Sequence, residues 1–563
     1  MSSSELLYSE IEDRLQRTIS QYPENENLPI PIARELLGEI LNVLEDGMAR
    51  ILRKRSKLLW LSTIRRVIPP SAVATSEFPG RDLRVLRILT AAILKYGSAS
   101  VEFRFGGLPK GSVIPFSGTE VAEARLLFEL ARRYQYTTQA LKATENGGGQ
   151  MSISSGWPQY KYDETTRRIA MLENTRREKW QNVLMPVGSL YVVDPDELTH
   201  PSKIWPSILV VFAIIGQTEP TLFTDPFRPE HSYLFNYMFS RIDLNPFFSL
   251  ARSYTFVIQE ETGLTADDIL ACWMSLSYFS ERLIVKEWAA MEDLLGSGLL
   301  RFPIEVLSKD LPSALATIPS PFQLSLPPQI VAQRFLSSMI LSDAQCKTID
   351  LHSGWIPTFI YRVDRYIIID WFTFRHTFSN LLFNVARKDQ IKNIKGDKFE
   401  KDIDNWLHSR IPHLEHLFRP NQKLKAEKQL YGEIDLSFIV RNVGFIIDCK
   451  AYNTSIAFHR GDAKAVKTRL DYTERWLSQV IRTAKKLAEQ PQGDNYQMPP
   501  EIEYLVPLVV STTVEPLFDL DEKHLVTEDI PRVCTPNELI EILTEIPIDA
   551  LINNSFTFTV KEE

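Results

Sequence analysis

Two aspartates and one lysine lie inside apolar stretches of the C-terminal part of the chain, where charged side chains are unusual. Asp435 stands in the run of residues 434–440, and Asp448 and Lys450 stand in the run 444–450. Aspartate is depleted in strands and costly to remove from water, so its presence in both runs indicates a chemical role. Two neighbouring carboxylates are the hard oxygen ligands that suit Mg²⁺, which keeps bound waters for contact with a substrate.

The two runs have the pattern of adjacent strands in a β-hairpin. Ile, Val and Phe dominate both, and the short polar link between them is typical of a turn. Residues two apart on a strand share a face, so Asp448 and Lys450 point the same way. Pairing of Val440 with Phe445 would place Asp435 opposite Lys450, with Asp448 as its diagonal neighbour. The hairpin therefore predicts a cluster of two carboxylates and one ammonium group.

This arrangement resembles the PD-(D/E)xK nuclease superfamily, whose motif is an Asp at the start of one strand and an acidic-x-Lys triplet on the next. The first part reads Ile434-Asp435 here instead of Pro-Asp, and the second reads Asp448-Cys449-Lys450. The opening Gly-Glu-Ile-Asp is most similar to the branch of Mrr-type and Holliday-junction-resolvase-like enzymes. The resemblance covers only the C-terminal part of the chain, and it implies a restriction-endonuclease-like α/β domain there.

The core of that family has the order helix, three strands, helix, strand, and the sequence supplies a candidate for each element. A helical pattern covers residues 396–411, and residues 423–430 are expected to form the first strand. The hairpin gives the next two strands. Residues 463–489 predict a long helix and residues 502–511 a strand. The expected fold of this part is a mixed central sheet flanked by helices.

The resemblance also implies a role for each residue of the site. The implied catalytic residues are Glu400, Asp435, Asp448, Lys450 and, on the second helix, Gln479. Asp435, Asp448, Glu400 and the main-chain carbonyl of Cys449 would hold Mg²⁺, for which Mn²⁺ could substitute. Lys450 would orient the attacking water or help to deprotonate it. Two alternatives stay open: a buried salt bridge in an unrelated sheet, and a nuclease fold that has lost catalysis.

A chain of 563 residues is too long for one hydrophobic core, and its length predicts two to four domains. With 44% hydrophobic and 24% charged residues, the composition is that of a folded globular protein. We expect a multidomain chain with a mostly α-helical N-terminal region and a C-terminal α/β domain. The expected parts are a helical N-terminal domain (1–145), a helical, aromatic-rich middle region (146–328), a hairpin-and-helix connector (329–390) and the nuclease-like domain with an acidic C-terminal tail (391–563).

Charge is distributed unevenly along the chain, whose net charge is −8. Residues 391–500 hold 19 Lys and Arg against 14 Asp and Glu, whereas residues 501–563 hold 3 against 14. The basic part suits a phosphate backbone, and binding there should weaken as salt rises. The apolar run 208–215 is shorter than the roughly 20 residues of a membrane-spanning helix, and residues 1–5 show no secretory leader. We expect a cytoplasmic protein without a membrane partner.

Other polar groups are weaker candidates for a site. The four cysteines form no C-x-x-C pair, so the sequence predicts no zinc ribbon. His408, His413 and His416 suggest a metal, but without a further convergent ligand a surface cluster is favoured. The basic stretch 49–66 could meet nucleic acid, an anionic membrane or an acidic partner, although a solvated helix face is the favoured interpretation. Asp370 has no acidic-x-Lys partner and is left outside the site.

The sequence therefore predicts a Mg²⁺-dependent nuclease that hydrolyses phosphodiester bonds, with DNA favoured over RNA. Residues 1–390 carry no recognisable catalytic motif. By analogy with nucleases joined to large non-enzymatic regions, we expect a regulated effector, as in restriction or anti-phage defence. Its N-terminal region would bind a protein partner or form a homo-oligomer. The alternative from a different class is a non-catalytic nucleic-acid-binding or scaffold protein that uses a nuclease-like fold.

Overall fold

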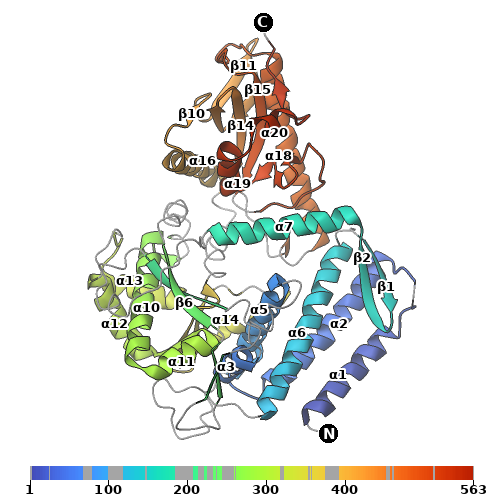
Figure 1. Cartoon of the computed structure of the whole chain (residues 1–563), viewed down its shortest axis with the longest axis vertical. Helices are drawn as coiled ribbons and strands as arrows, with labels where there is room; N and C mark the ends of the chain where they lie inside the picture. Colours follow the sequence, from blue (N-terminus) through green and yellow to red (C-terminus); the bar gives the residue numbers. More distant parts are fainter. Residues whose placement is uncertain are drawn as a thin grey trace. The chain divides into compact units, whose positions relative to one another are not determined.

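The computed structural model of the chain contains helices and sheets, with helices dominating the N-terminal half (Figure 1). The structure describes residues 3–24, 26–67, 79–98, 118–145, 149–183, 207–213, 221–224, 232–235, 237–243, 259, 262–317, 323–352, 356, 358–374, 392–451, 457–458, 462–511 and 514–561. The helix expected between the connector hairpin and the nuclease-like part lies outside these residues.

The chain forms two compact units that do not follow its linear order. Unit 1 comprises residues 1–161 and 185–385, and unit 2 comprises residues 162–184 and 386–563. The four consecutive segments expected from sequence are thus grouped differently, because contacts between distant segments leave no mark on a local pattern. The middle region and the connector belong with the N-terminal helices, apart from one short segment that belongs with the C-terminal part.

Helices form most of unit 1. They are α1 (Ser3–Ile19), α2 (Ile30–Leu52), α3 (Lys57–Val67), α5 (Pro79–Tyr96), α6 (Gly118–Glu145), α10 (Ala266–Lys286), α11 (Trp288–Ser297), α12 (Ile304–Thr317), α13 (Pro328–Ser338) and α14 (Asp343–Lys347). Leu36, Ile40 and Leu44 of α2 are fully buried at helical spacing, and α2 packs against α6. The expected helical character of the N-terminal region is confirmed for the described residues.

Small antiparallel sheets complete unit 1 and correct one expectation. Their strands are β1 (Gly149–Ser154), β2 (Trp157–Tyr162), β3 (Ser207–Ala213), β4 (Thr221–Thr224), β5 (Ser232–Phe235), β6 (Tyr237–Asp243), β7 (Leu299–Pro303), β8 (Ile360–Val363) and β9 (Tyr366–Asp370). Strand β3 pairs with β6, and β4 pairs with β5. The helical assignment of the middle region is therefore wrong for these strands. Short runs rich in β-branched and aromatic residues favour strands, and their periodicity alone does not separate strand from helix.

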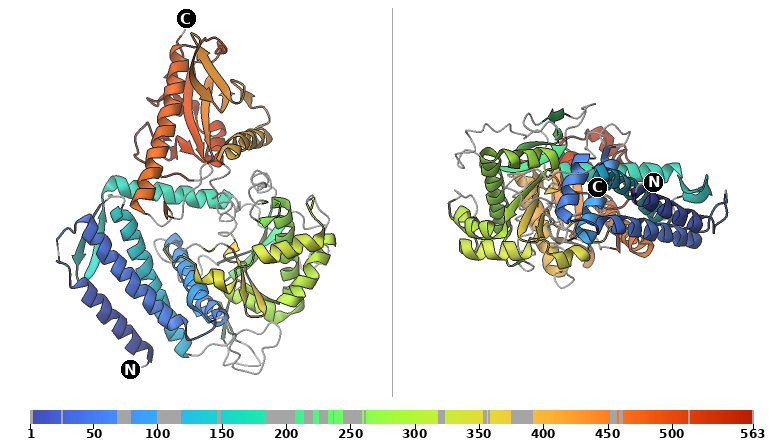
Figure 2. Two further views of the ribbon diagram at one scale, coloured as in Figure 1. Left: turned by 180° about the vertical axis from the view of Figure 1, so that it is seen from behind. Right: turned by 90° about the horizontal axis from the view of Figure 1, so that it is seen from below.

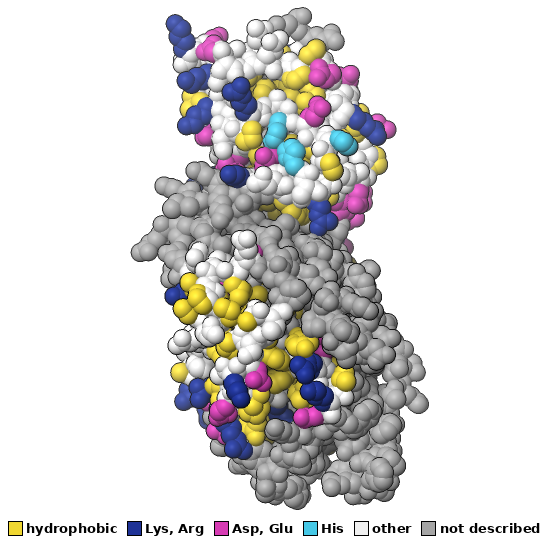
Figure 3. All heavy atoms as spheres, turned by 90° about the vertical axis from the view of Figure 1, so that its left-hand side faces the viewer, with side chains coloured by type: hydrophobic (Ala, Val, Ile, Leu, Met, Phe, Trp, Pro, Cys, Tyr) yellow, Lys and Arg dark blue, Asp and Glu magenta, His cyan; other side chains and the backbone are white. Residues whose placement is uncertain are grey.

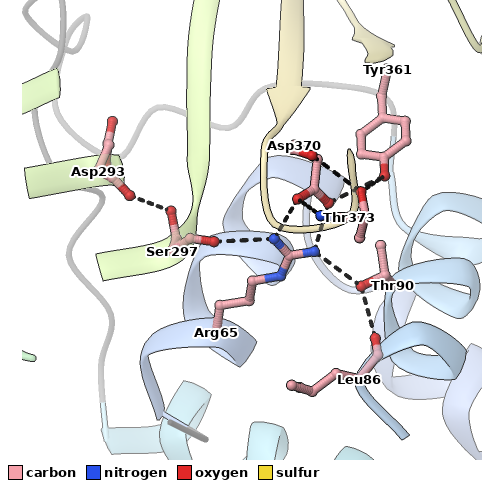
Figure 4. Close-up of polar contacts among 8 residues, drawn as sticks. All are labelled: Arg65, Leu86, Thr90, Asp293, Ser297, Tyr361, Asp370 and Thr373. Atoms are coloured by element: carbon pink, nitrogen blue, oxygen red, sulfur yellow. Dashed lines mark hydrogen bonds and ion pairs between the residues drawn. The ribbon is translucent and has the colours of Figure 1, made fainter. Parts of the chain in front are cut away.

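Arginines of the basic stretch 49–66 form ion pairs inside unit 1. Arg65 is 1% exposed and donates to both carboxylate oxygens of Asp370 at 2.6 Å (Figure 4). Arg55 pairs with Glu123 at 3.2 Å. The expected solvated helix face is wrong for these two arginines, because their acidic partners come from segments far away in the sequence.

Unit 2 is built around a six-stranded mixed sheet. Its elements are α7 (Glu164–Val183), α16 (Lys392–Arg410), β10 (Glu415–His416), β11 (Gln422–Ala426), β12 (Gln429–Ile434), β13 (Leu436–Val440), β14 (Val443–Lys450), α18 (Ala463–Glu489), β15 (Tyr504–Ser511), β16 (Leu525–Thr527), β17 (Ile530–Pro531), β18 (Val533–Cys534), α19 (Pro536–Thr544), α20 (Ile548–Ile552) and β19 (Phe558–Thr559). The sheet has the order β10-β13-β14-β15-β18, and β19 pairs with β15. Strand β14 is antiparallel to β13 and parallel to β15.

Helices cover both faces of this sheet, and α18 runs along one of them (Figure 2). Phe445 of β14 packs in the core that contains Phe399 of α16. The next residue, Ile446, packs in the core that contains Val480 of α18. This alternation is expected for a strand buried on both faces. The mixed α/β character expected of the C-terminal part is confirmed.

Two expectations for unit 2 are wrong in detail. The single strand predicted at 423–430 is a hairpin, because Glu427 and Lys428 adopt positive φ angles of 52° and 65° and reverse the chain between β11 and β12. The acidic segment 501–563 is not a tail. It supplies strands of the main sheet, and Leu539 of α19 is fully buried.

A buried arginine holds α7 within unit 2. Arg176 donates from Nε and Nη2 to the two carboxylate oxygens of Glu538 at 2.7 and 3.0 Å. It also donates to the main-chain oxygens of Val533 at 3.0 Å and Glu515 at 3.1 Å. A two-pronged arginine–carboxylate contact fixes both partners in orientation as well as in distance. Arg176 and Glu538 are 362 positions apart, so no sequence spacing could reveal the pair.

Candidate active site

The hairpin of β13 and β14 exists, but its register differs from the expected one. Val440 pairs with Val443 and Leu436 pairs with Ile447, so only two residues form the turn. Arg441 in that turn adopts a positive φ of 57°. The predicted pairing of Val440 with Phe445 is wrong because this tight turn replaces the longer loop.

The corrected register changes which groups face each other. Continuing the pairing by one residue beyond Leu436 sets Asp435 opposite Asp448, where Lys450 was expected. Residues that pair directly in an antiparallel ladder project to the same face. The two carboxyls therefore lie side by side, and the electrostatic interaction between them is strong.

Asp435 lies at the break between β12 and β13. Its Oδ2 accepts a hydrogen bond from the Cys449 N–H at 2.7 Å, and its main-chain oxygen accepts one from the Asn421 N–H at 2.9 Å. The Asp435 side chain thus accepts the hydrogen bond of a β14 N–H group that a main-chain carbonyl would accept in a regular strand pair. This contact holds the carboxyl beside Asp448.

Asp448 lies at the end of β14 with 7% of its surface exposed. Its Oδ1 accepts a hydrogen bond from Lys450 Nζ. Its Oδ2 is inaccessible to solvent and accepts no hydrogen bond from an N–H or hydroxyl group of the described residues. The neighbouring Asp435 carboxyl could donate to it, but only when Asp435 is protonated. A buried carboxylate oxygen without a donor is a group that a cation would satisfy. The side chain of Lys450 is 21% exposed, so solvent reaches this end of the cluster.

Burial and the neighbouring Asp448 carboxylate together raise the pKa of Asp435 to about 7, although Lys450 acts in the opposite direction. For Lys450, burial alone would lower the pKa, but the ion pair with Asp448 outweighs burial and raises it. Lys450 is therefore a cation at neutral pH. Without a metal, Asp435 therefore keeps its proton up to near neutral pH.

Glu400 of α16 lies near Cys449 but does not complete the cluster. It is 9% exposed, and its charge, with those of Asp435 and Asp448, raises the pKa of the buried Cys449 thiol, for which burial is the largest cause. The carboxyl groups of Glu400, Asp435 and Asp448 do not all come within 4.8 Å of one another. The structure therefore brings together Asp435, Asp448 and Lys450, and the role of Glu400 as a metal ligand stays a prediction. The Cys449 carbonyl stays a predicted metal ligand.

Gln479 is not part of this cluster. Its side chain is exposed on α18, and within the described part of the chain it makes no contact with the three carboxyls. Its main-chain oxygen accepts a hydrogen bond from Thr483 Oγ1 at 3.1 Å, as in an ordinary helix turn. Its catalytic role stays a prediction without support from a contact.

A buried ion pair next to the cluster escaped the sequence analysis. Ser511 of β15 pairs in register with Lys450, and its hydroxyl donates to Glu515. Glu515 is fully buried and accepts from Arg469 of α18 through both carboxylate oxygens. Arg469 thus neutralises Glu515 and joins α18 to the end of β15. Its partner lies 46 positions away with no shared motif, so the sequence carried no signal for the pair.

Comparison of the chain with protein-family models, curated proteins and solved structures found no match. None of the helices within the described ranges is both long and apolar enough to cross a membrane. The geometry of the cluster and the order of the elements around it are therefore the basis for any functional conclusion.

Asp435→Asn should stabilise unit 2 at high pH and leave its stability unchanged at low pH. The folded pKa of Asp435, about 7, lies above the unfolded value of roughly 4. Below pH 4 the carboxyl is protonated in both states, so its ionisation does not reduce the free energy of unfolding. The reduction grows between pH 4 and pH 7 and reaches its full value above pH 7. Asn still accepts the Cys449 N–H but carries no charge. We expect about 1–2 kcal/mol of added stability at pH 8 in a chelator, measured by thermal unfolding.

The matched control for this change is Asp529→Asn, because Asp529 is exposed in the turn between β16 and β17. It should have little effect at any pH. An equal stabilisation by Asp435→Asn at pH 4 and pH 8 would show that the gain does not come from the ionised carboxyl.

Proposed function

We propose that unit 2 is a Mg²⁺-dependent nuclease of the PD-(D/E)xK type that hydrolyses phosphodiester bonds, with DNA favoured over RNA. The observation that carries the proposal is the convergence of Asp435, Asp448 and Lys450 at the end of the β13–β14 hairpin. Glu400 of α16 is near enough for its charge to act on the Cys449 thiol. Asp448 Oδ2 is buried and accepts no hydrogen bond within the described residues, so it is available to bind a cation. Carboxylate oxygens are the ligands that Mg²⁺ prefers.

The order of the elements supports the family resemblance. Helix α16 is followed by the five strands β10, β11, β12, β13 and β14, by α18 and by β15. This order of helix, strands, helix and strand agrees with the one implied by the resemblance, with two strands more than the three expected before α18. The antiparallel β13–β14 pair and the parallel β14–β15 pair give a mixed sheet with a helix on each face.

In this proposal Asp435 and Asp448 hold the metal ion, and Glu400 assists. When bound, Mg²⁺ would neutralise the scissile phosphate and acidify a coordinated water. Lys450, kept protonated by Asp448, would hold the attacking water or the phosphate oxygen by its remaining N–H groups. Hydrolysis by this route needs no covalent intermediate on the protein.

A row of cations on α18 supports a nucleic-acid substrate. Six exposed basic residues recur at helical spacing and line one face of α18, which is opposite its buried face. They are Lys464, Lys467, Arg475, Arg482, Lys485 and Lys486. Lys and Arg side chains also gather along one edge of the upper part of the molecule in Figure 3. Such a row would neutralise phosphates and make binding weaken as salt rises.

Unit 1 would then regulate the nuclease, as in a restriction or anti-phage effector, by binding a protein partner or by forming a homo-oligomer. Its buried charges are used in internal pairs such as Arg65–Asp370. In the part of unit 1 that the structure describes, no three His, Cys, Asp or Glu side chains come together as potential metal ligands. The regulatory role of this unit is proposed by analogy with other nucleases joined to large non-enzymatic regions.

The direct test is cleavage by the purified chain. Supercoiled plasmid DNA and a structured RNA are incubated with Mg²⁺, with Mn²⁺ or with EDTA, at low and high salt. We expect nicked or linear DNA with either metal and none with EDTA, and less cleavage at high salt. Salt-sensitive binding of both nucleic acids without cleavage in any metal would instead support the non-catalytic alternative.

A further inference from the structure

A second group of potential metal ligands lies on α16 and the edge strand β10. Asp404 and His408 are one turn apart on α16, and His416 of β10 faces them. One ligand atom from each residue lies within 4.8 Å of those of the other two. Sequence reasoning considered His408 and His416 but lacked a third ligand. The i, i+4 spacing of Asp404 and His408 on a predicted helix was the signal that could have supplied it.

The distances in this cluster are those of a metal site. Asp404 Oδ1 lies 3.3 Å from His408 Nδ1 and 3.2 Å from His416 Nε2. Ligands bound to one Zn²⁺ at about 2.0–2.1 Å in tetrahedral geometry lie about 3.3 Å apart, so both separations match the edge of such a site. The third separation, between the ligand atoms of the two imidazoles, is below 4.8 Å.

Hydrogen bonding does not explain the arrangement. Asp404 Oδ1 and His416 Nδ1 are inaccessible to solvent and have no hydrogen-bond partner among the described residues. The two imidazole contacts to Asp404 Oδ1 are close enough for ion pairs but are not aligned as hydrogen bonds. A carboxylate oxygen placed between two imidazole nitrogens, without a hydrogen bond to either, is the arrangement that a bound cation would explain.

The surroundings hold the ligands in place and leave their side chains partly exposed to solvent. The His416 ring stacks on Phe438 of β13, with ring centroids 5.0 Å apart. His408 Nδ1 lies 2.9 Å from the main-chain oxygen of Asp404, a contact that orients the ring and that a metal at Nδ1 would replace. The side chains of Asp404, His408 and His416 are 22%, 36% and 28% exposed. Figure 3 shows neighbouring histidines beside an acidic side chain at the surface of the upper part of the molecule.

We propose that Asp404, His408 and His416 form a Zn²⁺ site with three protein ligands and at least one position open to solvent. A set of two imidazole nitrogens and one carboxylate oxygen favours Zn²⁺ over Mg²⁺, which prefers oxygen ligands alone. The ion would join α16 to the edge of the main sheet. The proposal does not depend on the nuclease function, because it rests on different side chains.

The test is metal binding by the full-length, untagged chain after removal of metal with a chelator. Zn²⁺ is titrated in competition with a chromogenic chelator, and Co²⁺ is added separately so that its d–d absorption reports the ligand geometry. We expect one Zn²⁺ per chain at this site and a low-symmetry Co²⁺ spectrum. His408→Ala and His416→Ala should each weaken binding by about 10- to 100-fold or more.

His413→Ala is the matched control, because His413 is exposed in the link between α16 and β10 and is outside the cluster. It should bind Zn²⁺ as the unaltered chain does. Asp448→Asn should also retain this binding, since Asp448 lies in the other cluster. Zn²⁺ binding that survives both His→Ala changes, or that is lost in Asp448→Asn instead, would overturn the assignment, as would failure of the unaltered chain to bind Zn²⁺.

Discussion

Asp448→Asn should abolish metal-dependent cleavage, with a loss of at least about 10³-fold in rate. Asn has nearly the same shape as Asp but supplies no negative charge, so Asp435 would be left as the only carboxylate of the hairpin beside the ion. The amide also removes the anion that holds Lys450 in place through its Nζ hydrogen bond. One substitution therefore weakens both the metal site and the position of the lysine.

This result can be separated from a loss of folding. Asp529→Asn makes the same chemical change on an exposed turn of unit 2 and should retain full cleavage. Asp448→Asn should unfold at or above the temperature of the unaltered chain in EDTA at pH 8, because it removes one of two adjacent buried carboxylates. Metal-dependent cleavage that persists in Asp448→Asn would place the active site elsewhere in the chain.

Local patterns were enough to predict the site's main parts. Apolar runs interrupted by Asp435, Asp448 and Lys450 indicated a hairpin that gathers two carboxyls and one ammonium group, and the structure brings these three side chains together. The long amphipathic segment 463–489 corresponds to α18 at both ends. These features depend on neighbouring residues, so the sequence shows them directly.

Features that depend on distant residues could not be predicted in this way. The hairpin register depends on a two-residue turn in which Arg441 has a positive φ. Arginine rarely adopts this conformation, so the residue type does not predict the turn. The membership of α7 in unit 2 depends on Arg176 meeting Glu538. The approach of His416 to Asp404 and His408 depends on the position of His416 on an edge strand beside α16.

The buried pair Arg65–Asp370 shows how strongly unit 1 depends on such a distant contact. Besides Asp370, the Arg65 guanidinium donates to the Ser297 main-chain oxygen at 3.1 Å. Asp370 accepts further hydrogen bonds from the Tyr361 hydroxyl at 3.2 Å and the Thr373 N–H at 3.1 Å (Figure 4). The pair thus links α3, the end of α11 and the β8–β9 hairpin in one network.

Arg65→Ala should destabilise unit 1 by about 3–5 kcal/mol, because it leaves the fully buried Asp370 carboxylate without its counter-charge. Arg125→Ala, which removes an exposed arginine from α6, should cost less than about 1 kcal/mol. Hydrogen exchange of peptides from α3 and β9 measures the effect within unit 1 alone, since unit 2 contributes no signal to those peptides.

A second variant distinguishes the lost pairing from lost packing. Asp370→Asn in the Arg65→Ala background removes the unpaired charge. Its Oδ1 can still accept from the Thr373 N–H, and its amide N–H can donate to the Tyr361 hydroxyl oxygen, so it should recover a large part of the lost stability. If packing were the cause, the double variant would be no more stable than Arg65→Ala. Recovery would show that most of the lost stability comes from a buried carboxylate left without a cation. Removal of one charge of a buried ion pair is expected to destabilise a protein far more than removal of both charges.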